Sequence, residues 1–207
     1  MVLWNPVIVF LQEFRYCGPM KTDYADSLET GLTFELVGVD ATLALGRELG
    51  RVLARQASAY GVLCLLFFGE LGAGKTTLTR GLVAALPGGE NAEVSSPSFT
   101  LCNVYPTTPS VLHCDLYRSE FGSLPDEVAE ALDADNGLIL VEWAERIADE
   151  DLPPKRLDIR FRPCNNNRLV TLEPRGEAAC SVLRELTQLR GLLSEGGVSA
   201  IQVMTKE

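Results

Sequence analysis

The sequence predicts an α/β fold in which helices cover a mixed, partly antiparallel sheet. A continuous apolar run at Val62–Phe68 leads through a glycine-rich stretch into an amphipathic pattern over Lys75–Leu86. This order is typical of a strand buried on both faces followed by a helix. A second apolar run lies at Gly137–Glu142, and the segments Arg156–Arg162 and Arg168–Glu173 flank an asparagine turn that indicates an antiparallel hairpin. Strands of both kinds, interleaved with helices, favour a three-layer arrangement.

The remaining elements follow from periodicity and turn signals. Asp40 is a suitable N-cap for a helix from Ala41 to Gln56, whose leucines recur at helical spacing. Pro87 and the two glycines after it end the helix that follows the glycine-rich stretch. The other expected elements are strands at Thr33–Gly38, Phe99–Tyr105 and Val111–Leu116, short helices at Asp126–Leu132 and Trp143–Asp149, and a terminal helix at Ala178–Leu193.

Composition favours one globular domain with short extensions. The chain has 207 residues, of which 46% are hydrophobic, enough for one sizeable core. We expect the domain to occupy residues 32–175, with a leader at 1–31 that has no clear period and is poorly ordered. A C-terminal helix and tail would then occupy 176–207. Met20 is an alternative start of the chain.

Charge and hydropathy exclude several classes of protein. The formal net charge is -10, and a surface this acidic disfavours tight unaided binding to nucleic acid. The apolar run Val7–Leu11 is too short to span a bilayer and lacks the early positive charge of a secretory signal. We therefore expect a cytoplasmic protein that does not associate with membranes. The six cysteines show no closely spaced pair, so we expect reduced, mostly buried thiols.

The glycine-rich stretch Gly69–Thr76 reads GELGAGKT and fits the phosphate-loop pattern G-x-x-x-x-G-K-[ST]. Its glycines let successive backbone N–H groups converge at a helix N-terminus, where they attract a phosphate chain. The lysine would reach the outer phosphates, and the threonine hydroxyl would take one Mg²⁺ position. The fold is therefore expected to be P-loop NTPase-like, with ATP and Mg²⁺ as ligands. The predicted nucleotide-binding residues of the loop are Gly69, Glu70, Leu71, Gly72, Ala73, Gly74, Lys75, Thr76 and Thr77.

Two acids end strands that can lie beside the loop. Val111–Cys114 leads to Asp115, and Leu138–Val141 leads to Glu142. Because ligands of α/β sheets collect at the carboxyl ends of strands, either acid can hold Mg²⁺ or orient a water. Which of the two orients water stays open at this stage. His113 is the sole histidine and shares a strand face with Asp115, which favours a supporting role.

Four stretches, taken in order, resemble the TsaE family, the ATPases of bacterial tRNA threonylcarbamoyladenosine (t6A) biosynthesis. The resemblance covers about residues 33–173. The stretches are Gly69–Thr77, Ser96–Thr100, His113–Arg118 and Leu140–Trp143.

This resemblance implies a function and roles for particular residues. It implies an ATP-binding and hydrolysing component that works with the TsaB–TsaD complex on the adenosine beside the tRNA anticodon, with tRNA contacted only indirectly. It implies Thr76 and Glu142 as Mg²⁺ ligands, and Asp115 and Glu142 with Lys75 as catalytic residues. Ser96 and Thr100 would belong to a mobile segment near the outer phosphate. Trp143, beside Glu142, can either pack near the nucleotide base or fill the core. Hydrolysis is expected to be slow for the isolated chain, because the sequence shows no obvious arginine finger near the loop.

Two other functions fit the phosphate loop. A P-loop small-molecule kinase would need an arginine-bearing lid, yet residues 119–135 are acidic and contain no arginine. A nucleotide-dependent switch without enzyme activity is the second alternative, although no Asn-Lys-x-Asp guanine reader is present. The alternating Arg156, Arg160 and Arg162 indicate either a solvated strand face or a docking patch for a partner or tRNA.

Overall fold

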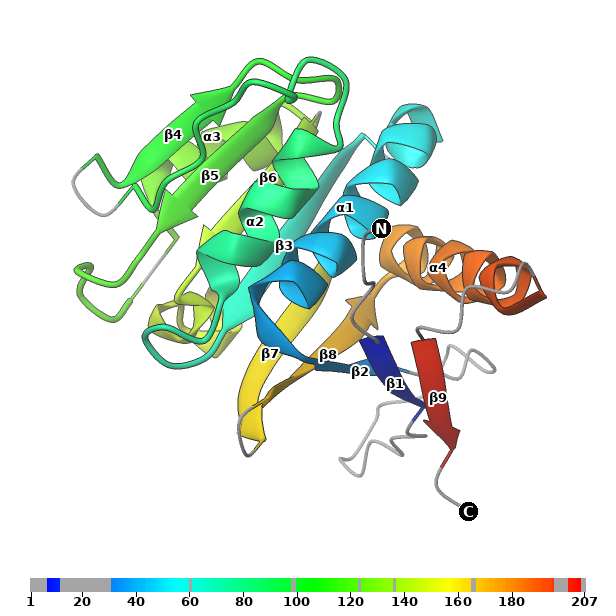
Figure 1. Cartoon of the computed structure of the whole chain (residues 1–207). Coiled ribbons are helices and arrows are strands. Elements are labelled where there is room, and N and C mark those ends of the chain that lie inside the picture. Colours follow the sequence, from blue (N-terminus) through cyan, green and yellow to red (C-terminus); the bar gives the residue numbers. More distant parts are fainter. Residues whose placement is uncertain are drawn as a thin grey trace, which may run out of the picture.

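The structure is a computed structural model, and its strands form one mixed sheet covered by helices (Figure 1). It describes residues 7–11, 31–59, 61–97, 100–122, 124–135, 137–164, 167–195 and 201–205. The strands are β1 (Val7–Leu11), β2 (Leu32–Leu36), β3 (Val62–Phe68), β4 (Cys102–Tyr105), β5 (Val111–Asp115), β6 (Gly137–Glu142), β7 (Arg156–Cys164), β8 (Asn167–Arg175) and β9 (Ile201–Thr205). The helices are α1 (Gly38–Gln56), α2 (Lys75–Ala84), α3 (Asp126–Asp133) and α4 (Glu177–Glu195).

The sheet order is β4-β5-β6-β3-β7-β8-β2-β1-β9 within the described residues. Strands β5, β6, β3 and β7 run parallel to one another. Strand β4 pairs antiparallel with β5, and β8 pairs antiparallel with β7 and β2. The predicted mixed sheet and the β7–β8 hairpin are therefore confirmed. Seven strands, β2 to β8, make up the body of the sheet, and β1 and β9 extend it beyond β2.

Strand β3 shows why its sequence is a continuous apolar run. Leu63, Leu65 and Phe67 pack into a core shared with α1, α2 and α4, while Cys64 and Leu66 pack on the opposite face with α3. Both faces of this central strand are buried, so no polar alternation can appear in its sequence. The carboxyl end of β3 leads directly into the phosphate loop.

Helices α1 and α2 approach each other through glycines. A methyl group added at Gly46 would lie 2.3 Å from the carbonyl oxygen of Leu78, and one at Gly81 would lie 2.4 Å from that of Leu43. Real Cβ atoms do not come this close to backbone, so the two helices touch main chain to main chain. Since α2 begins at the phosphate loop, this glycine contact fixes the position of the loop against α1.

Several predicted boundaries differ from the observed ones. Helix α1 begins at Gly38, and Asp40 lies in its first turn without capping it. Helix α2 ends at Ala84. No helix covers Trp143–Asp149, which instead holds two 3-10 turns at Ala144–Arg146 and Asp149–Asp151. The backbone is left-handed at Trp143, with φ of 61°, and extended at Ile147 and Ala148, so an α-helix cannot run through this segment.

The two terminal strands lie in the segments treated above as leader and tail. Strand β1 pairs antiparallel with β2 and parallel with β9. Among the described residues, no helix is long and apolar enough to cross a membrane.

Candidate functional site

The phosphate loop connects β3 to α2 and adopts the backbone that its glycines allow. Gly69, Gly72 and Gly74 have φ values of 139°, 77° and 107°. Gly74 occupies the N-cap of α2 in a left-handed conformation, which a residue with a side chain would adopt only at a cost of about 1 kcal/mol or more. The pattern of positive φ angles is the one that the motif predicts.

Lys75 opens helix α2 and is almost entirely buried. Its ammonium group donates to the carbonyl oxygens of Gly69 and Glu70, the second at 3.0 Å, and lies 3.8 Å from the centroid of the Trp143 ring. Burial lowers the pKa of Lys75, while the carboxylates of Glu145, Glu142 and Asp115 act in the opposite direction. The loop thus holds a buried cation whose charge the nearby carboxylates favour.

Glu142 links the loop to the neighbouring strand. Its Oε2 accepts a hydrogen bond from the Thr76 hydroxyl at 2.9 Å, and its Oε1 lies 3.0 Å from Nε2 of His113. Glu142 and His113 are both buried. The two protein groups predicted to hold Mg²⁺ are therefore adjacent, and they are oxygen donors of the hard type that Mg²⁺ prefers beside phosphate. His113 orients the carboxylate, consistent with the supporting role expected for it.

Asp115 ends β5 directly opposite Glu142 in the β5–β6 register. Its carboxylate accepts hydrogen bonds from the Ser96 hydroxyl and from the backbone N–H of Tyr117, the latter at 2.9 Å. Its own N–H donates to the carbonyl oxygen of Leu101. Asp115 thus ties both ends of the 96–101 segment to the edge of the sheet where the loop lies.

Trp143 follows Glu142 and covers the lysine. Its positive φ is unusual for a bulky residue and turns the ring back over the Lys75 ammonium group. The ring of Tyr117 packs beside it, with centroids 4.9 Å apart. Strained backbone at such a position points to function, since packing alone would favour an ordinary conformation.

The structure does not draw every predicted site residue into this cluster. The Thr100 hydroxyl donates to Asn103, and Leu71 at the loop tip is 73% exposed. Thr77 lies half-buried in the first turn of α2. Ser98 and Phe99, which belong to a stretch that carries the resemblance, lie outside the described residues. Within the described part of the chain, no group of three or more His, Cys, Asp or Glu side chains that could hold a metal ion is present.

Comparisons with known proteins agree with this geometry. The family model described as "Threonylcarbamoyl adenosine biosynthesis protein TsaE" matches residues 37–170. The chain belongs to the TsaE family. Its membership implies a nucleotide-binding P-loop protein of tRNA threonylcarbamoyladenosine biosynthesis, which confirms the resemblance seen in the sequence.

The matches to individual relatives span most of the length of those relatives. The chain is 46% identical over 122 residues to the tRNA threonylcarbamoyladenosine biosynthesis protein TsaE of Streptomyces coelicolor, covering 56% of this chain and 77% of that protein. It is 36% identical over 144 residues to the protein of the same name from Mycobacterium bovis, covering 65% and 80%. The crystal structure of Bacillus subtilis YdiB superposes with a TM-score of 0.60 at 27% identity, covering 77% of this chain and 96% of that one.

One arginine of this TsaE-family chain lies beside the loop, although no sequence pattern indicated it. Arg168 comes from β8 and donates from its guanidinium to the carbonyl oxygen of Ala73 at 3.3 Å. A methyl group at Gly74 would lie 2.5 Å from the same guanidinium. Arg168 and Ala73 are 95 positions apart in the sequence. Sequence reasoning missed their contact because only the pairing of β8 within the sheet brings Arg168 close to the loop.

Arg168→Ala is expected to weaken ATP binding about five- to tenfold, because the loop loses a charge-assisted hydrogen bond to its backbone. Isothermal titration calorimetry with Mg²⁺–ATP measures the change. Arg162→Ala is the matched control, since Arg162 lies exposed on the same hairpin and its loss should leave binding unchanged. Equal affinities for Arg168→Ala and the parent chain would contradict the role of Arg168.

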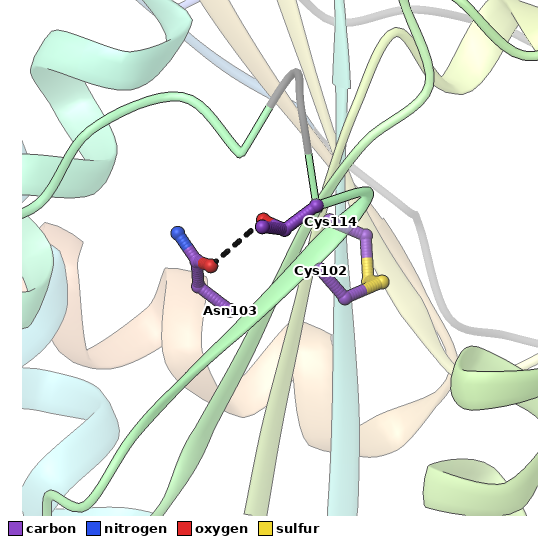
Figure 2. Close-up of a disulfide and its surroundings, with 4 residues drawn as sticks. Cys102, Asn103 and Cys114 are labelled. Atoms are coloured by element: carbon purple, nitrogen blue, oxygen red, sulfur yellow. Dashed lines mark hydrogen bonds between the residues drawn. A yellow bond between two sulfur atoms is a disulfide. The ribbon is translucent and has the colours of Figure 1, made fainter.

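The expectation that all six cysteines are reduced is wrong for one pair. Cys102 and Cys114 form a disulfide between β4 and β5 (Figure 2). They are 12 positions apart and directly opposite in the antiparallel register, so the hairpin and not a short spacing brings them together. Cys64 remains a buried thiol, as expected.

The row of arginines on β7 is partly neutralised. Arg156 and Arg160 both contact Asp158, at 2.9 and 3.6 Å, and Arg160 also contacts Glu173 at 3.1 Å. Asp158 is buried, so these two arginines balance a charge inside the protein. A docking role for the row remains a prediction.

Proposed function

We propose that this chain is the ATP-hydrolysing component of the t6A modification machinery and acts with the TsaB–TsaD complex and Mg²⁺. The observation that carries this proposal is the contact between Thr76 and Glu142 beside the buried Lys75. A hydroxyl from the loop and a carboxylate from the adjacent strand form the half-site that a phosphate-bound Mg²⁺ requires.

The loop residues would bind different parts of the ATP phosphates. The backbone N–H groups of Gly69–Thr77 would surround the phosphates, and Lys75 would move from the carbonyls of Gly69 and Glu70 to the outer phosphates. Trp143 would cover the lysine and keep water from it. This exchange conserves hydrogen bonds, because phosphate oxygens replace carbonyl oxygens as acceptors.

Thr76 and Glu142 would hold Mg²⁺, with His113 fixing the orientation of the Glu142 carboxylate. The metal ion, when bound, supplies positive charge to the phosphate oxygens. Asp115 is then the acid left to orient a water, because the Glu142 carboxylate beside Thr76 would be taken up by the metal ion. The bond between Asp115 and Ser96 would carry the state of the outer phosphate to the 96–101 segment.

Slow hydrolysis by the isolated chain is the expected result. Both oxygens of Asp115 and both oxygens of Glu142 already accept protein hydrogen bonds or contact His113. A docked partner that opened one of these contacts would leave a carboxylate oxygen freer to align a water. Turnover below about 0.1 per second alone, rising at least about tenfold with TsaB–TsaD, is the corresponding prediction.

Phosphate release without any added acceptor measures this turnover and separates hydrolysis from kinase activity. A pull-down of TsaB–TsaD with and without ATP, run in parallel, tests the partnership. Rapid hydrolysis by the isolated chain that TsaB–TsaD does not change would contradict the proposal, as would phosphate transfer only to a small-molecule acceptor.

A further inference from the structure

The disulfide joins the edge strand β4 to its neighbour β5. Strand β4 is the outermost strand on its side and pairs with β5 alone among the described strands. Cys102 begins β4, and Cys114 lies opposite it in β5 (Figure 2). Cys102 is partly exposed, whereas Cys114 is buried. The bond therefore closes the open end of the β4–β5 hairpin, opposite its turn.

The same end of the hairpin carries the 96–101 segment and Asp115. The segment bonds to Asp115 through Ser96 at one end and through the Leu101 carbonyl at the other. Cys102 directly follows Leu101, and Cys114 directly precedes Asp115. The disulfide is thus a covalent link between the two residues that flank the contact between Leu101 and Asp115.

We propose that Cys102 and Cys114 form a redox-modification site whose closure fixes the base of the 96–101 segment against Asp115. Its effect on turnover rests on the function proposed above, whereas the formation of the bond does not. The reactive partner is a low-molecular-weight disulfide of the glutathione type. No other pair of cysteines is bonded in the part of the chain that the structure describes.

The chemistry proceeds by two thiol–disulfide exchanges. The Cys102 thiolate, the more accessible of the two, attacks one sulfur of R–S–S–R, forms Cys102–S–S–R and releases one thiol R–SH after protonation. The Cys114 thiolate then attacks Sγ of Cys102 and expels the second R–S⁻, which also takes up a proton. Two cysteine thiols are oxidised and one external disulfide is reduced to two thiols. Cys64 stays outside this chemistry, because burial raises its pKa to about 12.

Reduction would free the start of β4. A four-residue strand with one neighbour is held by few backbone hydrogen bonds, so its end opens easily without a covalent link. Opening would separate Leu101 from Asp115. Because Asp115, in the proposed mechanism, is freer to orient a water once its protein contacts open, we expect the oxidised chain to turn over ATP at least about threefold more slowly than the reduced chain.

The experiment equilibrates the full chain with mixtures of oxidised and reduced glutathione, followed by acid quenching, alkylation and peptide mass spectrometry. Hydrogen exchange of residues 96–104 and phosphate release with TsaB–TsaD are then measured for both forms. Cys102→Ser serves as the permanently open form. Cys164→Ser is the matched control, since Cys164 is half-buried and lies outside the pair.

We expect a linked 102–114 peptide at oxidising mixtures, faster exchange of residues 96–104 on reduction, and an open-form rate for Cys102→Ser in every mixture. Cys164→Ser should behave as the parent chain. Alkylation of both Cys102 and Cys114 in every mixture would overturn the site. Identical hydrogen exchange in the two forms would overturn the fixing of the segment. A changed exchange with no ATP hydrolysis in either form would support the redox site and contradict the proposed function alone.

Discussion

Replacing Lys75 by alanine is expected to weaken Mg²⁺–ATP binding by about a hundredfold or more. The ammonium group is the cation that the loop keeps buried, and its bonds to Gly69 and Glu70 place it within reach of bound phosphates. Alanine removes the charge while preserving helix propensity at the start of α2. Isothermal titration calorimetry gives the dissociation constants directly.

Lys155→Ala is the control for net charge, because Lys155 is exposed and lies in the loop before β7. It should bind ATP as the parent chain does. Circular dichroism of Lys75→Ala should show the parent spectrum, so that a loss of binding reports on the site. If Lys75→Ala bound Mg²⁺–ATP within about threefold of the parent, the loop would not hold the nucleotide in the way proposed.

Glu142→Gln is expected to reduce ATP hydrolysis by about a hundred- to a thousandfold with only a small change in ATP affinity. The amide keeps the shape of the side chain but removes the negative charge that would face Mg²⁺, and it alters the pairing with His113. Because the phosphates are bound by the loop, binding should survive. Single-turnover phosphate release with TsaB–TsaD measures the chemical step.

Glu150→Gln provides a matched control for the loss of one carboxylate charge. Glu150 is exposed and lies in the 3-10 turn Asp149–Asp151, which follows the end of β6. Its neutralisation should change the rate by less than about threefold. A Glu142→Gln chain that hydrolyses ATP as fast as Glu150→Gln would remove Glu142 from the mechanism.

Much of the frame of this site could be predicted from local sequence. Strand β6 is the expected Gly137–Glu142, because a short apolar run between a glycine and an acid has few alternatives. The same reasoning placed Asp115 and Glu142 at one sheet edge, and they are partners in the β5–β6 register. Strand ends of a parallel sheet converge, so local patterns suffice for these residues.

The contacts missed are those that depend on pairing between distant segments. Arg168 reaches the loop because β8 pairs with β7, and Cys102 meets Cys114 because β4 pairs back on β5. The left-handed backbone of Trp143 also has no local signal, since a bulky residue ordinarily avoids it. Register and strained backbone are decided by the whole sheet, so a single sequence contains little trace of them.

The close contact between α1 and α2 implies that the two sides of the site differ in rigidity. Main-chain contact at Gly46 and Gly81 leaves little room for the helices to move closer, so a shift of the phosphate loop toward α1 would be costly. Motion during a catalytic cycle is therefore expected on the side of β4 and Asp115. Nucleotide would then be bound by the rigid α1–α2 side of the site, and a partner would act on the more mobile β4–β5 edge of the sheet.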